Sequence, residues 1–73
     1  MPADPAPVPT PRHENVIAEA ARIAVRLGHD YVGVEHLFLA IVRDPGAVPS
    51  QVLAETQDLG EIDARLSEVM RTY

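Results

Sequence analysis

Residues 27–39, LGHDYVGVEHLFL, constrain the fold of this 73-residue chain more than any other stretch. Gly28 ends a segment with helical periodicity, at the position where a capping glycine is typical because glycine adopts the left-handed conformation at little cost. A strongly apolar segment begins directly after Gly33. The stretch therefore predicts two helices joined by a tight connector.

The segment before Gly28 has the signals of a helix over residues 11–27. Thr10 can accept a hydrogen bond from an amide of the first turn, and Pro11 fits the first helical position, where no donor is needed. Apolar residues recur at spacings of three and four, which predicts one buried stripe. The stripe consists of Val16, Ile17, Ala20, Ala21, Ala24 and Leu27.

Three further helices are expected after the connector. Residues 34–43 are apolar on nearly every side, which is typical of a central, buried helix, and Asp44-Pro45-Gly46 predicts a chain reversal. A short helix over residues 48–56 should place Val52 and Leu53 inward, and Asp58 should cap a last helix over residues 58–71. These patterns predict an all-α fold, a compact bundle of four helices without strands.

Composition excludes several classes of function. The net charge is −5, the 30 residues from position 44 onward are the acidic part, and no basic patch suits a phosphate backbone, so we expect no nucleic-acid partner. Without cysteine there is no disulfide or thiolate metal site. The longest apolar run is too short to span a bilayer, which predicts no membrane association. Residues 1–9 should form a disordered, Pro/Ala-rich tail without the pattern of a secretory signal, so we expect a cytoplasmic protein.

The run RLGHDYVGVEHLFLAIVRDPG resembles the Clp N-terminal repeat, the small helical module at the front of ClpA- and ClpC-type AAA+ unfoldases. Thr10, the alanine pair at 20 and 21 and the Asp58-opened last helix support the resemblance, which covers residues 10–71. The family's N-domain contains two such repeats packed as a pseudo-symmetric pair. The resemblance implies that residues 10–73 are one repeat, half of that N-domain, in a standalone form that lacks the ATPase module and is not an unfoldase.

The resemblance also implies ligand-binding positions. In the ClpC branch the N-domain recognises phosphorylated arginine through a glutamate and a threonine, and the matching positions here are Glu35 and Thr10. A carboxylate can pair with a guanidinium, and a helix start favours anions. The family commonly has threonine where this chain has Val34, so the second helix should lose a favoured cap. Both ligand positions also have an ordinary structural explanation, as a cap and as a first-turn acid.

Gly28, His29, Gly33 and His36 are interpreted as the scaffold of the connector, with the two histidines bonding connector backbone groups. Histidine and glutamate are zinc ligands, but the spacing of His29, Glu35 and His36 matches no metal motif, so we expect no metal or other cofactor. No nucleophile elbow, glycine-rich phosphate loop or paired carboxylates indicates catalysis. We therefore expect no catalytic residues.

Two functional hypotheses follow. The first is a non-catalytic protein-binding module of the Clp chaperone and protease system, which recognises a Clp ATPase, an adaptor or a substrate. The second is a structural or regulatory interaction domain that keeps the fold without Clp-related binding. Because one repeat normally covers the other, a single repeat should leave an apolar face exposed, and we expect a homodimer.

Overall fold

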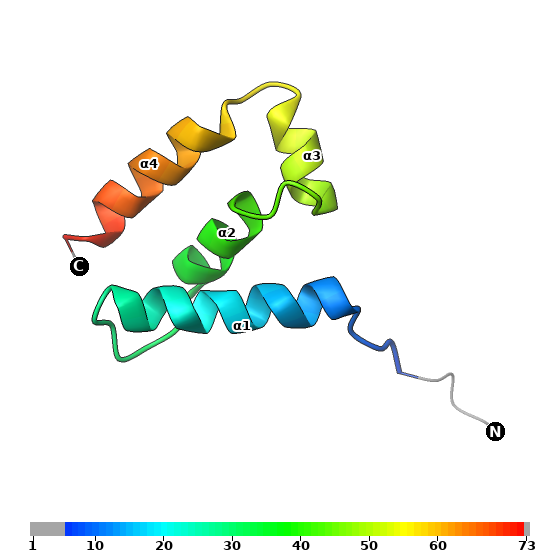
Figure 1. Cartoon of the computed structure of the whole chain (residues 1–73), viewed down its shortest axis with the longest axis horizontal. Helices are drawn as coiled ribbons and strands as arrows, with labels where there is room; N and C mark the ends of the chain where they lie inside the picture. Colours follow the sequence, from blue (N-terminus) through cyan, green and yellow to red (C-terminus); the bar gives the residue numbers. More distant parts are fainter. Residues whose placement is uncertain (1–5, 73) are drawn as a thin grey trace.

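The computed structural model describes residues 6–72 and shows four helices joined by short connections (Figure 1). These are α1 (Pro11–Arg26), α2 (Val34–Val42), α3 (Val48–Ala54) and α4 (Leu59–Met70). Residues 6–72 contain no strand, so the predicted all-α fold is confirmed, with each helix ending one or two residues earlier than expected. The predicted tail lies partly outside the described residues, and residues 6–10 adopt no helix or strand.

The ends of the helices follow from local sequence. Thr10 Oγ1 accepts a hydrogen bond from the His13 amide at 3.1 Å, and Asp58 Oδ1 accepts one from Gly60 at 2.8 Å. At the end of α1, Gly28 has a φ of 73°. The Gly28 amide donates to Val25 and the His29 amide donates to Ala24, which together form a Schellman motif. The local signals therefore fix where α1 and α4 begin and where α1 stops.

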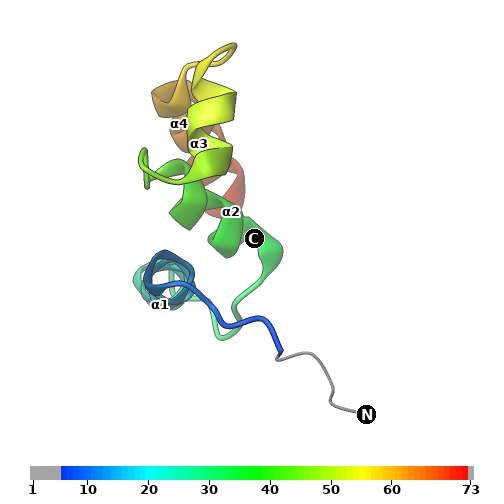
Figure 2. The same ribbon diagram turned by 90° about the vertical axis from the view of Figure 1, so that its right-hand side faces the viewer.

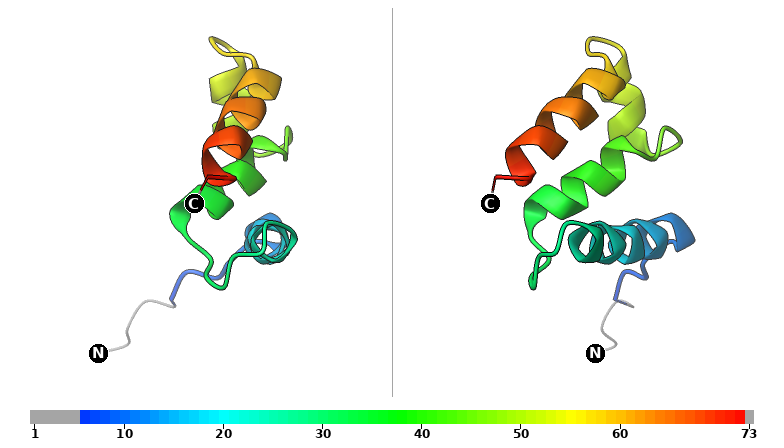
Figure 3. Two further views of the ribbon diagram at one scale, coloured as in Figure 1. Left: turned by 90° about the vertical axis from the view of Figure 1, so that its left-hand side faces the viewer. Right: turned by 60° about the vertical axis from the view of Figure 1, so that its left-hand side comes forward.

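Helix α2 lies between α1 and α4 and packs against all three other helices (Figure 1, Figure 3). Viewed along α1, that helix stands at one end of the molecule and α3 with α4 at the other (Figure 2). Residues from α1, α2 and α4 meet in one buried cluster of Ala20, Ile23, Leu39, Ala40 and Met70. The alanines Ala20 and Ala40 let α1 and α2 approach closely, so α2 is central as predicted.

Helix α3 is oriented differently from the prediction. Val52 is 59% exposed, whereas Ser50 is fully buried and Leu53 is half-buried. The Ser50 hydroxyl donates to the Ile41 carbonyl at the end of α2. This bond turns the Ser50 side of α3 toward α2, so the inward placement of Val52 is wrong.

An ion pair joins the end of α2 to the middle of α4. Arg43 Nε donates to Asp63 Oδ2 at 2.8 Å and Arg43 Nη2 donates to Asp63 Oδ1 at 3.1 Å. The Ser67 hydroxyl also donates to Asp63 Oδ1, at 3.1 Å. The hydrogen bonds from Arg43 are the main reason that the pKa of the Asp63 carboxyl lies below its usual value. This pair therefore holds α4 against α2 through charge-assisted bonds.

We expect Asp63→Asn to destabilise the protein in a pH-dependent way. A carboxyl whose pKa is lowered by folding contributes stability above its unfolded pKa of about 4, and the contribution disappears as the pH falls through the folded pKa. Because the pair is partly exposed, the loss at neutral pH should be about 1 kcal/mol. Urea denaturation at neutral pH and near pH 2 measures it, and the difference from wild type should shrink at the lower pH.

Glu68→Gln is the matched control for this prediction. Glu68 pairs with Arg65 at 3.5 Å while both side chains are largely exposed, so its loss should leave the urea midpoint unchanged. An equal cost of Asp63→Asn at both pH values would show that the Asp63 charge does not stabilise the fold.

Candidate functional site

The α1–α2 connector is built around a pair of imidazole rings. His36 is completely buried in the first turns of α2, and its Nε2 lies 2.7 Å from Nδ1 of His29. The ring of Tyr31 stacks on His29 with centroids 5.1 Å apart and meets His36 edge-on at 5.2 Å. The three rings fill the space under the connector.

The backbone of Gly33 sets the direction of the hydrogen bond between the two imidazoles. The Gly33 amide donates to His36 Nδ1 at 2.9 Å, so this nitrogen has no hydrogen. His36 must then carry its hydrogen on Nε2 and donate it to Nδ1 of His29. The result is a directed chain of hydrogen bonds from Gly33 through His36 to His29.

The start of α2 differs from the prediction about Val34. The capping position belongs to Gly33, and Val34 is the first helical residue, so no capping side chain is lost at Val34. His36 instead binds the Gly33 amide from inside the helix. Both histidines were expected to bond connector backbone groups. His36 does so by accepting from the Gly33 amide, whereas His29 bonds the His36 ring. A sequence signal existed in the three-residue spacing of Gly33 and His36, which is that of a capping box.

Glu35 is held over the start of its own helix. Its carboxylate lies against Gly33, where a Cβ atom would collide with Oε1, and Oε1 is 3.9 Å from His36 Nδ1. An acid in the first turn interacts favourably with the positive end of the helix dipole. The Glu35 side chain remains 25% exposed, so it is accessible from one side.

Thr10 and Glu35 lie on different parts of the surface. Thr10 caps the first turn of α1, while the start of α2 lies against Ile17 and Ala20 further along α1 (Figure 1). Ile17 lies seven positions after Thr10, which is about 10 Å along the helix axis. The phosphate and guanidinium of one phosphoarginine are directly bonded to each other. Thr10 and Glu35 of one chain therefore suit two separate groups along a peptide better than they suit the joined phosphate and guanidinium of one phosphoarginine.

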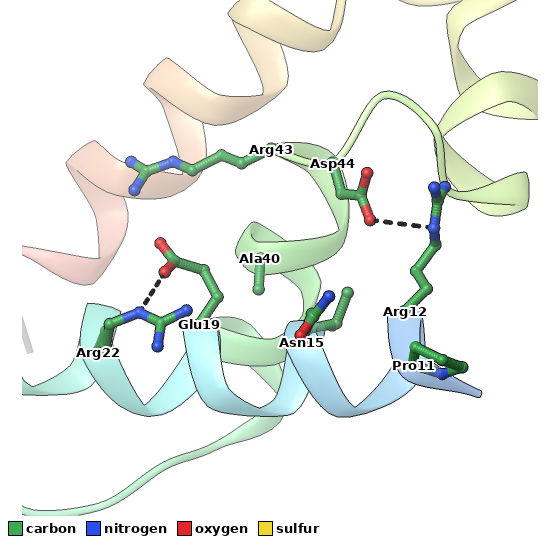
Figure 4. A pocket seen from close by; sticks show the side chains of 9 residues that line it. Pro11, Arg12, Asn15, Glu19, Arg22, Ala40, Arg43 and Asp44 are labelled. Carbon is green, nitrogen blue, oxygen red and sulfur yellow. Dashed lines mark hydrogen bonds and ion pairs between the residues drawn. The ribbon is translucent and has the colours of Figure 1, made fainter. Parts of the chain in front are cut away.

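A polar groove, which the sequence analysis missed, lies beside Thr10 between α1 and the end of α2 (Figure 4). It has a volume of about 550 Å³. Its lining consists of Pro11, Arg12, Asn15, Val16, Glu19, Arg22, Ala40, Arg43 and Asp44. The spacing of positions 12, 15, 19 and 22 places four polar residues on one face of α1. That spacing was available in the sequence, but only the fold brings this face beside the end of α2.

The charges in the groove are held by ion pairs. Glu19 binds Arg22 at 2.8 Å and Arg26 at 2.9 Å, and hydrogen bonds from Arg22 and then Arg26 keep the pKa of its carboxyl below the usual value. Arg12 Nε lies 3.6 Å from Asp44. An open groove with charges of both signs is suited to a polar peptide segment. Within residues 6–72, no cluster of three or more His, Asp or Glu side chains could hold a metal ion.

The chain belongs to the Clp repeat N-terminal domain family, whose sequence profile matches residues 8–72. It is 38% identical over 52 residues to ClpC, the ATP-binding subunit of the ATP-dependent Clp protease, of Staphylococcus saprophyticus. It is 39% identical over 44 residues to ClpC of Staphylococcus epidermidis and of Staphylococcus aureus. These alignments cover 71% and 60% of this chain but only 6% and 5% of the relatives. No solved structure matches the chain.

We expect substitutions of His36 to separate its packing from its hydrogen bonds. His36→Phe keeps most of the buried volume but leaves the Gly33 amide without its acceptor, which should cost about 1–3 kcal/mol. His36→Ala also leaves a cavity and should cost about 3–5 kcal/mol. Urea denaturation measures both, with His13→Ala on the exposed side of α1 as the control that leaves the midpoint unchanged. If His36→Phe has the same urea midpoint as wild type, the hydrogen bonds of the imidazole chain contribute nothing to stability.

Proposed function

We propose that this protein is a non-catalytic protein-binding module of the Clp system, which engages a Clp ATPase, an adaptor or a substrate. Membership of the Clp repeat N-terminal domain family over residues 8–72 carries the proposal. The relatives reported above are ATP-binding subunits of a Clp protease, and the chain spans about 6% of the length of the Staphylococcus saprophyticus protein. The proposed role is therefore that of the N-terminal repeat domain itself.

The binding surface that we propose starts at the N-terminus of α1. Thr10 is exposed there, and the neighbouring Pro11 and Arg12 open the polar groove. Three arginines and two acids line this groove, so it offers partners for both acidic and basic side chains of a peptide. Glu35 is the second contact, because its partly exposed carboxylate can accept a guanidinium. An arginine-containing peptide, with or without phosphorylation, is the proposed ligand class.

The proposed setting follows from charge and hydropathy. A net charge of −5 disfavours nucleic acid as a partner, and no helix in the described part of the chain is long and apolar enough to cross a membrane. We propose a cytoplasmic protein that works as a homodimer and uses no cofactor. The alternative proposal, a structural or regulatory domain without Clp-related binding, is favoured by the structural duties of Thr10 and Glu35.

Binding of a fluorescent arginine peptide tests the proposed ligand. We expect fluorescence anisotropy to show binding of both the phosphorylated and the unmodified peptide. The phosphorylated peptide should bind more tightly, because the helix start at Thr10 favours an anion. Glu35→Gln keeps the size of the side chain but removes its charge, and it should weaken binding of either peptide by about tenfold. Glu55→Gln, at the exposed residue that follows α3, is the control and should bind like wild type. Equal affinity of Glu35→Gln and wild type would remove Glu35 from the site.

Capture experiments separate the two proposals. The full chain should retain a purified Clp ATPase or one of its adaptors on an affinity support, and Glu35→Gln should retain less. If neither is retained and no arginine peptide binds, the structural or regulatory alternative is correct.

A further inference from the structure

Helix α2 exposes a side that carries no polar residue. Val34, Leu37, Phe38 and Ile41 follow one another at helical spacings of three, one and three, so they lie within an arc of about 100°. Val34 is 82% exposed and Phe38 is 41% exposed, while Leu37 and Ile41 are half-buried. We call these four residues the α2 ridge. A helix that is apolar all round is normally buried on all sides, and within the described residues no helix covers this ridge.

An apolar groove runs along each side of the α2 ridge. On one side, Ile17 and Ala20 of α1 face Val32, Val34 and Leu37 across a groove of about 340 Å³. On the other side, Phe38 faces α4 across a groove of about 360 Å³. Its apolar lining on α4 consists of Ile62, Leu66 and Val69. The ridge and its two grooves form one continuous apolar surface, which in a soluble protein marks an interaction site.

We propose that a second copy of this chain covers the α2 ridge, with the ridge of each copy lying in the groove between α2 and α4 of the other. The inference rests on the proposed homodimer and identifies its interface. A ridge beside a groove is complementary to its own two-fold copy, because the rotation places each ridge in the partner's groove. The same contact between a ridge and a groove therefore occurs twice in the dimer, once for each copy.

The charges at the edge of the α4 groove support a second copy as the occupant. Asp58 and Glu61 stand there together with Arg65, so the edge carries both signs. Arg65 meets Glu68 only at 3.5 Å with both side chains largely exposed, and Glu61 has no ion pair within residues 6–72. In a two-fold interface this edge of one copy faces the same edge of the other copy. Acids of one copy can then pair with Arg65 of the other, whereas an edge with charges of one sign would repel its copy.

The small size of the domain over residues 8–72 also favours a permanent partner. A domain near 70 residues buries only about 60% of its unfolded surface and has little stability to spare. A partner that binds only transiently would leave the α2 ridge in water for part of the time, whereas a second copy is always present. The polar groove at the start of α1 shares no lining residue with the two apolar grooves, so the dimer leaves it open.

Two matched variants test the interface. Val34 and Val48 are both the first residue of a helix, are 82% and 71% exposed, and accept an acid without harm to the helix dipole. Val34→Glu places a charge in the proposed interface, whereas Val48→Glu places the same charge on α3. Size-exclusion chromatography with light scattering should give twice the 7.9 kDa chain mass for wild type and Val48→Glu. Val34→Glu should be a folded monomer, with a dimer dissociation constant raised at least about 30-fold.

Each other outcome overturns a specific step. A wild-type monomer at high micromolar concentration removes the dimer, while the peptide-binding proposal is decided separately by anisotropy. A Val34→Glu dimer, or a Val48→Glu monomer, places the interface away from the α2 ridge. Circular dichroism checks folding, and if Val34→Glu is unfolded, Val34→Thr replaces it because it keeps the shape of valine. Val34→Thr should weaken the dimer about tenfold, and an unchanged dimer would overturn the assignment.

Discussion

The packing of α2 between α1 and α4 is the constraint on which the rest of the molecule depends. Nine residues, VEHLFLAIV, supply two of the five residues in the central cluster and the completely buried His36. The flanking helices bury His36, Leu39 and Ala40 but cover the opposite side only at its edges. The other three helices of the described residues do not enclose so apolar a helix. The unusual surface of the protein is therefore a consequence of its central element.

The connector holds α2 in place by two local devices. Gly28 lets the chain leave α1 through a Schellman motif, and the Gly33 amide is fixed by the imidazole of His36. His29 then binds His36, so the third residue after α1 is tied to the third residue of α2. Both histidines therefore hold the connector together. Glu35 is the polar residue at the start of α2 whose side chain is partly exposed. The connector thus positions Glu35 at the start of α2.

Local signals predicted the helices well because caps and glycines act over a few residues. Thr10, Gly28 and Asp58 each perform the role that their sequence context indicates. The orientation of α3 was not predictable in this way, because it depends on the Ser50 hydroxyl reaching a carbonyl on another helix. For the candidate site, the residue types at positions 10 and 35 were readable from the family pattern. Their separation and the polar groove beside Thr10 arise from the packing of α1 on α2, which a linear pattern does not contain.

The apolar and polar surfaces of the protein use different sides of α2. Ala40 and Arg43 belong to the polar groove, and both lie on the side of the helix away from Val34 and Phe38. Covering the α2 ridge with a second copy therefore leaves Arg12, Asn15 and Asp44 accessible. Under two-fold symmetry the proposed dimer would present two polar grooves and two copies of Glu35. A peptide long enough to reach both copies would gain affinity by linking two weak contacts, without a deep pocket in either chain.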